Sequence, residues 1–163
     1  MFKIDSLKFV YMITIHTNFM TDILSFPETW IRDMSPNRIT HRFKVSEKTH
    51  TNNVLMSFCH IDSNLHRSYI KIAYDMLSNQ IIDEKDHMVE TDVSIHELHN
   101  ENGDGYYFMA TDSHWNGRED DWPYLMRCMY VTKTISVEMT VLCYDKESET
   151  IVQAFDFLKN KLS

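Results

Sequence analysis

The amino-acid sequence predicts an α+β domain in which an antiparallel sheet is flanked by two main helices. Two stretches carry apolar residues at helical spacing, and the runs between them show the alternating or clustered apolar pattern of strands. A sheet and a helix that each expose one apolar face must cover each other, so we expect both helices to pack against the sheet.

The first third of the chain is predicted to form strands. Residues 7–15 are rich in β-branched and aromatic types, and Phe26-Pro27-Glu28-Thr29-Trp30 follows as an apolar turn. Residues 38–45 and 54–61 are strand-length apolar runs. The polar stretch 47–53 between them is expected to be a hairpin connection.

The first helix is predicted to begin after Asp62, Ser63 and Asn64, whose side chains can cap a helix N-terminus. Apolar residues then recur at helical spacing, which indicates a helix with one buried face. The expected buried stripe consists of Leu65, Tyr69, Ile72, Ala73, Met76 and Leu77.

The second group of strands follows a charged turn at 83–86. Residues 89–95 alternate apolar and polar side chains, the pattern of a half-buried strand. A tight turn at 102–105 leads into an aromatic strand at 106–111, and two further runs form a predicted hairpin around 132–134. These runs span 124–131 and 135–144, and the second should bury Ile135, Val137, Met139, Val141 and Cys143 on one face.

The second helix closes the domain. Ser148 is a plausible N-cap, and Lys159 and Lys161 complement the carbonyl end of the helix dipole. Its expected apolar face consists of Ile151, Phe155, Leu158 and Leu162.

Length, charge and cysteine content restrict the class of protein. The chain is expected to be one domain, residues 1–163, and its formal net charge of −8 disfavours nucleic-acid binding. No apolar run is long enough to span a bilayer, and residues 1–20 lack an export signal, so we expect a soluble cytoplasmic protein, or a periplasmic one if the native start lies upstream. Cys59, Cys128 and Cys143 lie in apolar runs, as buried thiols in a reducing compartment do.

The order of these elements carries a resemblance. With Phe26-Pro27-Glu28-Thr29-Trp30 ahead of two strands, a helix, a meander and a terminal helix, the chain resembles the PsbP/DcrB-like superfamily of α/β/α sandwiches, whose commonest landmark is a Pro-x-x-Trp turn. The run Gly105-Tyr106-Tyr107-Phe108-Met109-Ala110-Thr111-Asp112, a following Pro-Tyr strand and a helix after Tyr144-Asp145 look like uncharacterised bacterial members of that group. The resemblance covers about residues 22–162 and implies one PsbP-like domain.

The resemblance also implies a kind of function. Known members mostly bind other proteins: they include a photosystem subunit, a nuclear-import factor acting on a small GTPase, and effector chaperones of a bacterial secretion system. A protein-binding or accessory, chaperone-like module is therefore expected. The shared motifs are short and structural, so they favour the fold more than any activity.

Two stretches have the composition of metal sites. In His96-Glu97-Leu98-His99, two imidazoles three positions apart end a predicted strand, where they point to opposite faces, so a solvated strand end is favoured over a zinc site. Asn100-Glu101-Asn102-Gly103-Asp104-Gly105 resembles the first half of an EF-hand loop. Thr111 stands where that loop needs a bidentate Glu, which favours a plain hairpin turn.

Signatures of catalysis are weak. Cys59 and His60 are adjacent in a predicted strand, so their side chains should diverge, and the acid pair Asp120-Asp121 is typical of solvated surface. No nucleophile elbow, P-loop or dinucleotide fingerprint occurs. We therefore expect no catalytic residues, no cofactor and no resident metal.

The stretch from Asp112 to Trp122 is the strongest candidate for a functional loop. It combines two tryptophans with ionisable groups of both signs, the composition of interaction hot spots, and loops on rigid scaffolds commonly carry function. The alternative is that both tryptophans fold back over the sheet edge. The predicted partner-binding residues are Asp112, His114, Trp115, Arg118, Asp120, Asp121 and Trp122.

Three functions remain as predictions. The first is a non-enzymatic protein-binding module, whose partner is another protein or a second copy of the chain. The second is a divalent-metal protein or metal-dependent hydrolase with Asp104, Asp112, His114 and Asp120 as ligands, since carboxylates suit hard ions. The third is a carrier of a small apolar ligand held among Tyr69, Tyr106 and Phe108.

Overall fold

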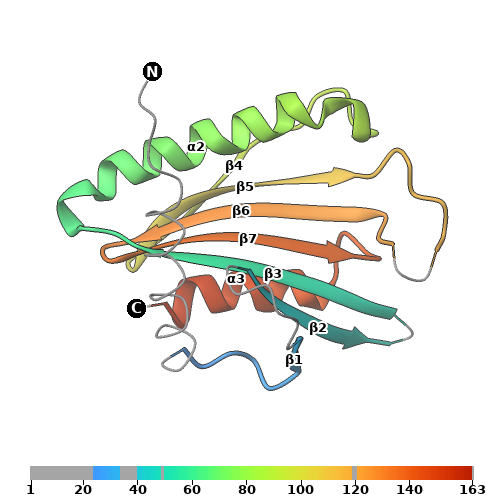
Figure 1. Ribbon diagram of the computed structural model, residues 1–163, viewed down its shortest axis with the longest axis horizontal. Helices are drawn as coiled ribbons and strands as arrows, with labels where there is room; N and C mark the ends of the chain where they lie inside the picture. The colour runs from blue at the N-terminus through green and yellow to red at the C-terminus, as the bar shows by residue number, and fades with distance from the viewer. Residues whose placement is uncertain (1–23, 34–39, 49, 119–120, 163) are drawn as a thin grey trace.

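The sheet forms the centre of the molecule. The computed structural model describes residues 24–33, 40–48, 50–118 and 121–162, and its strands form one seven-stranded sheet in the order β1-β2-β3-β7-β6-β5-β4 (Figure 1). Every neighbouring pair is antiparallel. The strands are β1 (Trp30–Asp33), β2 (His41–Glu47), β3 (His50–His60), β4 (His96–Asn100), β5 (Gly103–Thr111), β6 (Tyr124–Thr132) and β7 (Ile135–Cys143).

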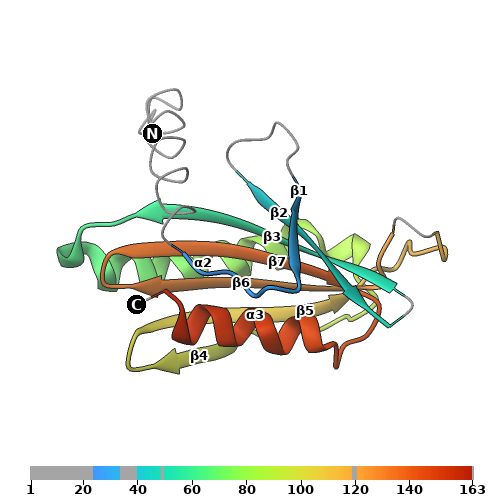
Figure 2. The same cartoon turned by 90° about the horizontal axis from the view of Figure 1, so that it is seen from below.

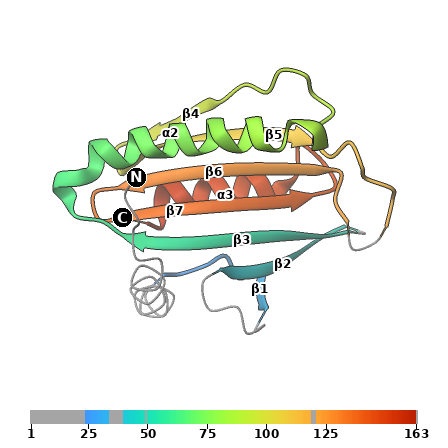
Figure 3. The same cartoon turned by 45° about the horizontal axis from the view of Figure 1, so that its top comes forward.

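Two helices lie on opposite faces of this sheet (Figures 2 and 3). Helix α2 (His66–Asp83) packs on β5 and β6, whereas α3 (Glu149–Asn160) packs on the other face against β7 and β2. Short 3₁₀ turns flank α2: η1 (Ser63–Leu65) precedes it and η2 (Lys85–His87) follows it. The predicted α+β class, with an antiparallel sheet and two helices, is confirmed.

Each face of the sheet has its own core. The predicted alternation in β7 is confirmed, because the five residues from Ile135 to Cys143 named above are all buried under α3. Ser148 caps α3 as predicted, with its side chain accepting a hydrogen bond from the Thr150 amide. The core under α2 is smaller and consists of Ile61, Ala73, Leu77, Met88, Phe108, Ala110, Met129 and Val131.

The Pro-x-x-Trp turn joins β1 to α3. The Trp30 amide donates to the Pro27 carbonyl (2.9 Å), which closes the turn. The Trp30 ring is buried against Phe43 and Phe157, and its Nε1 donates to Gln153 Oε1 at 2.9 Å. An edge strand of four residues is thereby fixed to the core by one side chain.

The predicted buried stripe of α2 is partly wrong. Ile72 and Met76 are exposed (46% and 38%), and the fully buried positions are Ala73 and Leu77. The small side chain of Ala73 lets the helix approach the sheet closely. The helix therefore faces the sheet with Ala73 and Leu77, and not with the larger Ile72 and Met76 that precede them. The partly buried flanks are Tyr69, Ile70 and Ile81.

The predicted strand at 89–95 is wrong. Met88 forms one isolated bridge with Asp112, and β4 begins only at His96. At this edge of β5 the carboxylate of Glu90 accepts the Thr111 amide (2.8 Å) and hydroxyl (2.6 Å), so a side chain takes the place of a strand backbone. The alternating pattern arises because Val93 and Ile95 still pack on the core under α2.

Other boundaries differ less. The connection expected at 47–53 is shorter, because β2 runs to Glu47 and β3 begins at His50. The strand expected at 7–15 lies outside the described residues. In the part of the chain that is described, no helix has the length and apolar character needed to cross a membrane.

Candidate functional site

The loop between β5 and β6 is fixed at its base. The Asp112 amide donates to the Pro123 carbonyl and the Ser113 amide to the His87 carbonyl, both at 2.9 Å. The second bond joins the loop to η2, at the C-terminal end of α2. Two segments that are distant in sequence therefore meet at one end of the sheet.

The first half of the loop is exposed, and the Asp112 side chain stabilises its turn. Its Oδ1 accepts the His114 amide at 2.7 Å, and Ser113 Oγ lies 3.1 Å from His114 Nδ1. The rings of His114 and His87 lie 5.1 Å apart. These contacts hold the His114 ring beside η2 while leaving it open to solvent.

The two tryptophans have different environments. Trp115 is 41% exposed, whereas Trp122 is half-buried and its Nε1 donates to the Thr51 carbonyl at 2.8 Å. Trp122 thus corresponds to the expected plug over neighbouring strands, and Trp115 corresponds to the exposed aromatic of a contact surface.

The remaining predicted residues divide in the same way. Asp121 Oδ1 accepts the Trp122 amide at 3.0 Å, and the Arg118 side chain is exposed while its carbonyl accepts from Tyr144 (3.5 Å). Asp120 lies outside the described residues.

A cavity of about 570 Å³ opens beside the loop. Its wall combines loop side chains with the end of α2, η2, β6 and β7, so both apolar and acidic groups face it. A volume of this size lies in the range of ligand and side-chain pockets. The lining residues are Glu84, His87, Met88, Asp112, His114, Asp121, Trp122, Leu125 and Leu142.

One of the three carboxylates in this wall is neutralised. Glu84 forms an ion pair with Arg127 at 2.7 Å, and the Arg127 side chain is 25% exposed. Among the described residues, no lysine or arginine pairs with Asp112 or Asp121, and the nearest ion-pair partner is His114, 3.9 Å from Asp112. The cavity therefore presents two carboxylates that no lysine or arginine in the described part of the chain neutralises.

The ligand set predicted for a metal is not assembled. Asp104 lies at the start of the nine-residue strand β5, and Asp112 lies just beyond its end. Because an extended strand rises roughly 3.4 Å per residue, the two carboxylates are at opposite ends of the strand. Asp112 and His114 do come together, but in the described ranges no group of three or more His, Cys, Asp or Glu side chains is arranged to hold a metal ion. Asp104 therefore does not share a site with Asp112 and His114, and Asp120, the fourth predicted ligand, lies outside the described residues.

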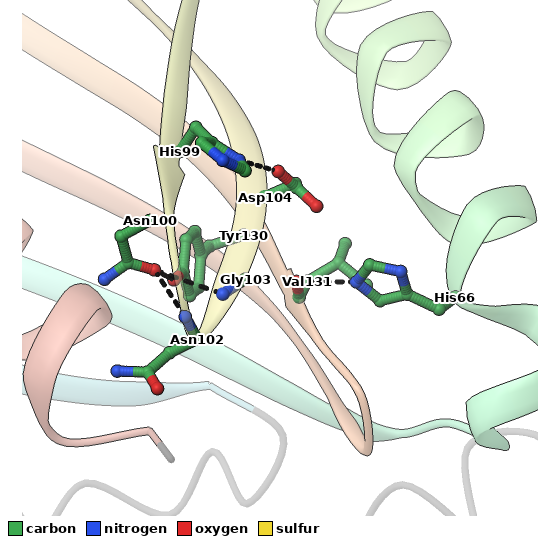
Figure 4. A network of polar contacts seen from close by, with 8 residues as sticks. All are labelled: His66, His99, Asn100, Asn102, Gly103, Asp104, Tyr130 and Val131. Atoms are coloured by element: carbon green, nitrogen blue, oxygen red, sulfur yellow. Dashed lines mark hydrogen bonds and ion pairs between the residues drawn. The ribbon is translucent and has the colours of Figure 1, made fainter.

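The stretch Asn100–Gly105 is a hairpin turn, as the sequence favours. Asn100 Oδ1 accepts hydrogen bonds from the Asn102 and Gly103 amides (3.1 Å each) and from the Tyr130 hydroxyl (Figure 4). The Asp104 carboxylate contacts His99. The side-chain oxygens of Asn100 and Asp104 are thus engaged within the chain.

This turn is also linked to α3. The side-chain amides of Asn100 and Asn102 both donate to the Lys159 carbonyl, at 3.0 and 2.8 Å, near the C-terminus of the helix.

The two histidines of β4 have different neighbours. His96 stacks on Tyr107 with ring centroids 5.1 Å apart, while His99 contacts Asp104. The two histidines therefore serve opposite faces of β4, as strand alternation predicts.

The aromatic residues proposed for a ligand carrier belong to the packing under α2. Phe108 is fully buried, and Tyr69 and Tyr106 pack against the same cluster. The cavities of about 570, 220 and 160 Å³ are lined by other residues. The three rings fill the space between helix and sheet.

A second polar cluster stabilises the start of α3. The Glu47 carboxylate accepts hydrogen bonds from Ser148 Oγ (2.6 Å), Thr150 Oγ1 (3.0 Å) and the Glu149 amide (3.1 Å). Burial alone would raise the pKa of Glu47, but these hydrogen bonds outweigh it and lower the pKa. Because every acceptor is used in capping, this cluster is structural.

Comparisons with known proteins give no relative. No family model, no curated protein and no solved structure matches this chain. The site is therefore interpreted from its own geometry.

Sequence reasoning identified the loop but missed the rest of the cavity wall. Glu84 and His87 come from a charged turn after α2, and Leu142 comes from β7, which follows the loop and β6 in the sequence. The charged run at residues 83–87 was the available signal, but nothing in the sequence places it beside the loop. That proximity depends on α2 packing on β5 and β6.

Proposed function

We propose that this protein is a non-enzymatic protein-binding module whose contact surface is the Asp112–Trp122 loop and the cavity beside it. The observation that carries the proposal is an exposed tryptophan, Trp115, in the loop whose residues Asp112, His114, Asp121 and Trp122 line a cavity. Tryptophans that become buried at the centre of a complex are typical hot spots, so an exposed tryptophan in a loop that lines a pocket favours recognition.

The loop is suited to recognition because its base is rigid. Backbone hydrogen bonds to Pro123 and His87 hold the amides of Asp112 and Ser113, so these two residues would lose little conformational freedom on binding. The exposed side chains need only adopt their bound rotamers.

The test is capture of a partner from native extract by the wild type and by Trp115→Ala. We expect a specific protein to be retained by the wild type, and its purified form to bind Trp115→Ala at least tenfold more weakly, about the cost of truncating a hot-spot residue. The Trp115→Ala, Trp122→Ala double variant should bind more weakly still.

Val152→Ala is the control, because Val152 is an exposed apolar residue (64% against 41% for Trp115) on α3, away from the loop. Circular dichroism must show that all variants are folded. Equal retention by Trp115→Ala and the wild type would exclude the loop as the contact surface. Sedimentation of the protein alone tests whether the partner is a second copy.

We also propose kinship with the PsbP/DcrB-like superfamily and a reducing, cytoplasmic compartment. The Pro27–Trp30 turn and a helix on each face of the sheet support the kinship. The free thiols of Cys59, Cys128 and Cys143 support the compartment. An experimental structure showing a different strand order from that superfamily would contradict the kinship.

A further inference from the structure

The wall of the 570 Å³ cavity has two chemical parts. The imidazoles of His87 and His114 line the cavity together with these two parts. Met88, which follows η2, and Leu125 and Leu142 of the sheet provide an apolar surface, and Asp112 and Asp121 provide carboxylates at the loop side. A ligand that fits both must have an apolar stem and a positive head.

Asp112 and Asp121 have no lysine or arginine partner among the described residues, and the ion-pair contact that Asp112 makes is with His114, at 3.9 Å. Arg127 pairs with Glu84. The formal net charge of −8 acts in the same direction and repels anionic ligands. The electrostatic complement is therefore a cation.

The aromatic wall restricts the cation further. The indole of Trp122 is held in place by its hydrogen bond to the Thr51 carbonyl (2.8 Å) and lines the cavity. A guanidinium group stacks on aromatic rings and can serve two carboxylates at once, whereas an ammonium group is a compact, strongly hydrated charge. Arginine therefore fits this cavity better than lysine.

We infer that the cavity receives an arginine side chain from a basic segment of the partner protein, with the aliphatic stem on Met88, Leu125 and Leu142. The head lies between the Trp122 indole and the Asp112 and Asp121 carboxylates. This inference rests on the proposed protein-binding function and names the partner's chemistry. An acidic or uncharged partner segment is excluded by it.

The test uses short fluorescein-labelled peptides and fluorescence anisotropy with the intact protein. One peptide carries a central arginine flanked by leucine and serine, and its matched partner carries citrulline, which keeps the shape and removes the charge. A third peptide carries lysine. We expect the arginine peptide to bind more tightly than the lysine peptide, the citrulline peptide to bind weakest, and added salt to reduce the difference.

The protein variant is Asp112→Asn with Asp121→Asn. Asparagine keeps the Oδ1 acceptor that each aspartate offers to the amide of His114 or Trp122, so the loop should keep its shape. Loss of two partly exposed charges should weaken arginine-peptide binding by roughly fivefold to thirtyfold.

Asp62→Asn with Asp156→Asn is the matched control. Both aspartates also accept a hydrogen bond through Oδ1, from Asn64 and Asn160, and the change in net charge is the same. This control should bind the arginine peptide like the wild type.

The outcomes separate the two proposals. Equal binding of arginine and citrulline peptides, no peptide binding at all, or equal losses in both aspartate pairs overturns the arginine inference. If Trp115→Ala still loses the captured protein in that case, the protein-binding function stands. If arginine peptides bind but Trp115→Ala retains every captured protein, the cavity inference stands and the loop hypothesis fails.

Discussion

The two ends of β5 use polar residues in opposite ways. At the β4–β5 turn, Asn100, Asn102 and Asp104 bond to the chain itself, through backbone amides, Tyr130, His99 and the end of α3. At the other end, Asp112 and Asp121 each accept one local amide and otherwise face a cavity. Polar residues that are saturated internally build structure, and those left unsaturated are available to a ligand.

The largest expected effect on stability is at the end of β5 beside the β4–β5 turn. A Cβ added at Gly105 would lie 2.9 Å from Tyr130 Cα and closer still to the Met129 carbonyl oxygen, both backbone atoms that cannot turn aside. We expect Gly105→Ala to lower the free energy of unfolding by about 3 kcal/mol or more, as overpacking does. Urea denaturation measures the change.

Gly117 in the loop is its counterpart. It has φ +81°, but a Cβ there meets nothing within 4 Å. Gly117→Ala should therefore cost only the backbone strain, about 1 kcal/mol. Equal losses at the two glycines would contradict the contrast between the two ends.

Asn100→Ala is expected to have the next largest effect. It removes the shared acceptor of the Tyr130 hydroxyl and the Gly103 amide and one of the two donors to Lys159, so the free energy of unfolding should fall by about 2 to 4 kcal/mol. Asn116→Ala in the loop loses only an exposed bond to the Arg118 amide and should change stability by less than about 0.5 kcal/mol. Thermal unfolding of both variants tests this ordering.

Glu90 makes the free energy of unfolding depend on pH, through its hydrogen bonds to Thr111 at the loop end of β5. Burial alone would raise the pKa of Glu90, but hydrogen bonds from the Thr111 hydroxyl and amide and from Lys146 lower it from 4.5 to about 2. Since the folded-state pKa is depressed, the stabilisation is complete above about pH 4.5 and is lost as the pH falls toward 2.

The Glu90→Gln variant should flatten this pH dependence. After allowance for solvent exposure, we expect it to lower the free energy of unfolding by about 1 to 2 kcal/mol at pH 7 and by little at pH 2.5. Denaturation at both pH values provides the measurement. A loss of the same size at both would show that the carboxylate charge is not responsible.

The smallest effect is expected at Trp115. Its side chain is 41% exposed, and among the described residues its indole forms no hydrogen bond, so Trp115→Ala should change the free energy of unfolding by less than about 0.5 kcal/mol. Trp122→Phe loses the hydrogen bond to Thr51 and should cost about 1 kcal/mol. A larger loss at Trp115 than at Trp122 would reverse their roles as contact residue and plug.

Local patterns predicted most elements because they report burial. The alternation in β7 and the Ser148 cap were correct, since each depends on neighbours in sequence. The strand at 89–95 was wrong because alternation reports which side chains touch the core and says nothing about whether the backbone has a partner strand. The face of α2 was misplaced because Ala73 contributes little to an apolar pattern but allows the closest approach.

The site was predictable only in part. The composition of the Asp112–Trp122 loop identified one wall of the cavity. The other wall, including Glu84 and His87, depends on where α2 ends over the sheet, which no local pattern encodes. The same limit explains why Asp104 was wrongly grouped with Asp112, since the two are close in sequence but lie at opposite ends of an extended strand.

The position of β7 between β3 and β6 has a consequence for synthesis of the chain. Asn53 of β3 pairs with Leu142 of β7, so the two halves of the sheet join only through residues far apart in sequence. During synthesis, the edge of β3 that pairs with β7 stays without a partner strand until β7 has left the ribosome. Pairings of such high contact order form slowly, and an uncovered strand edge is where a nascent chain aggregates or recruits a chaperone.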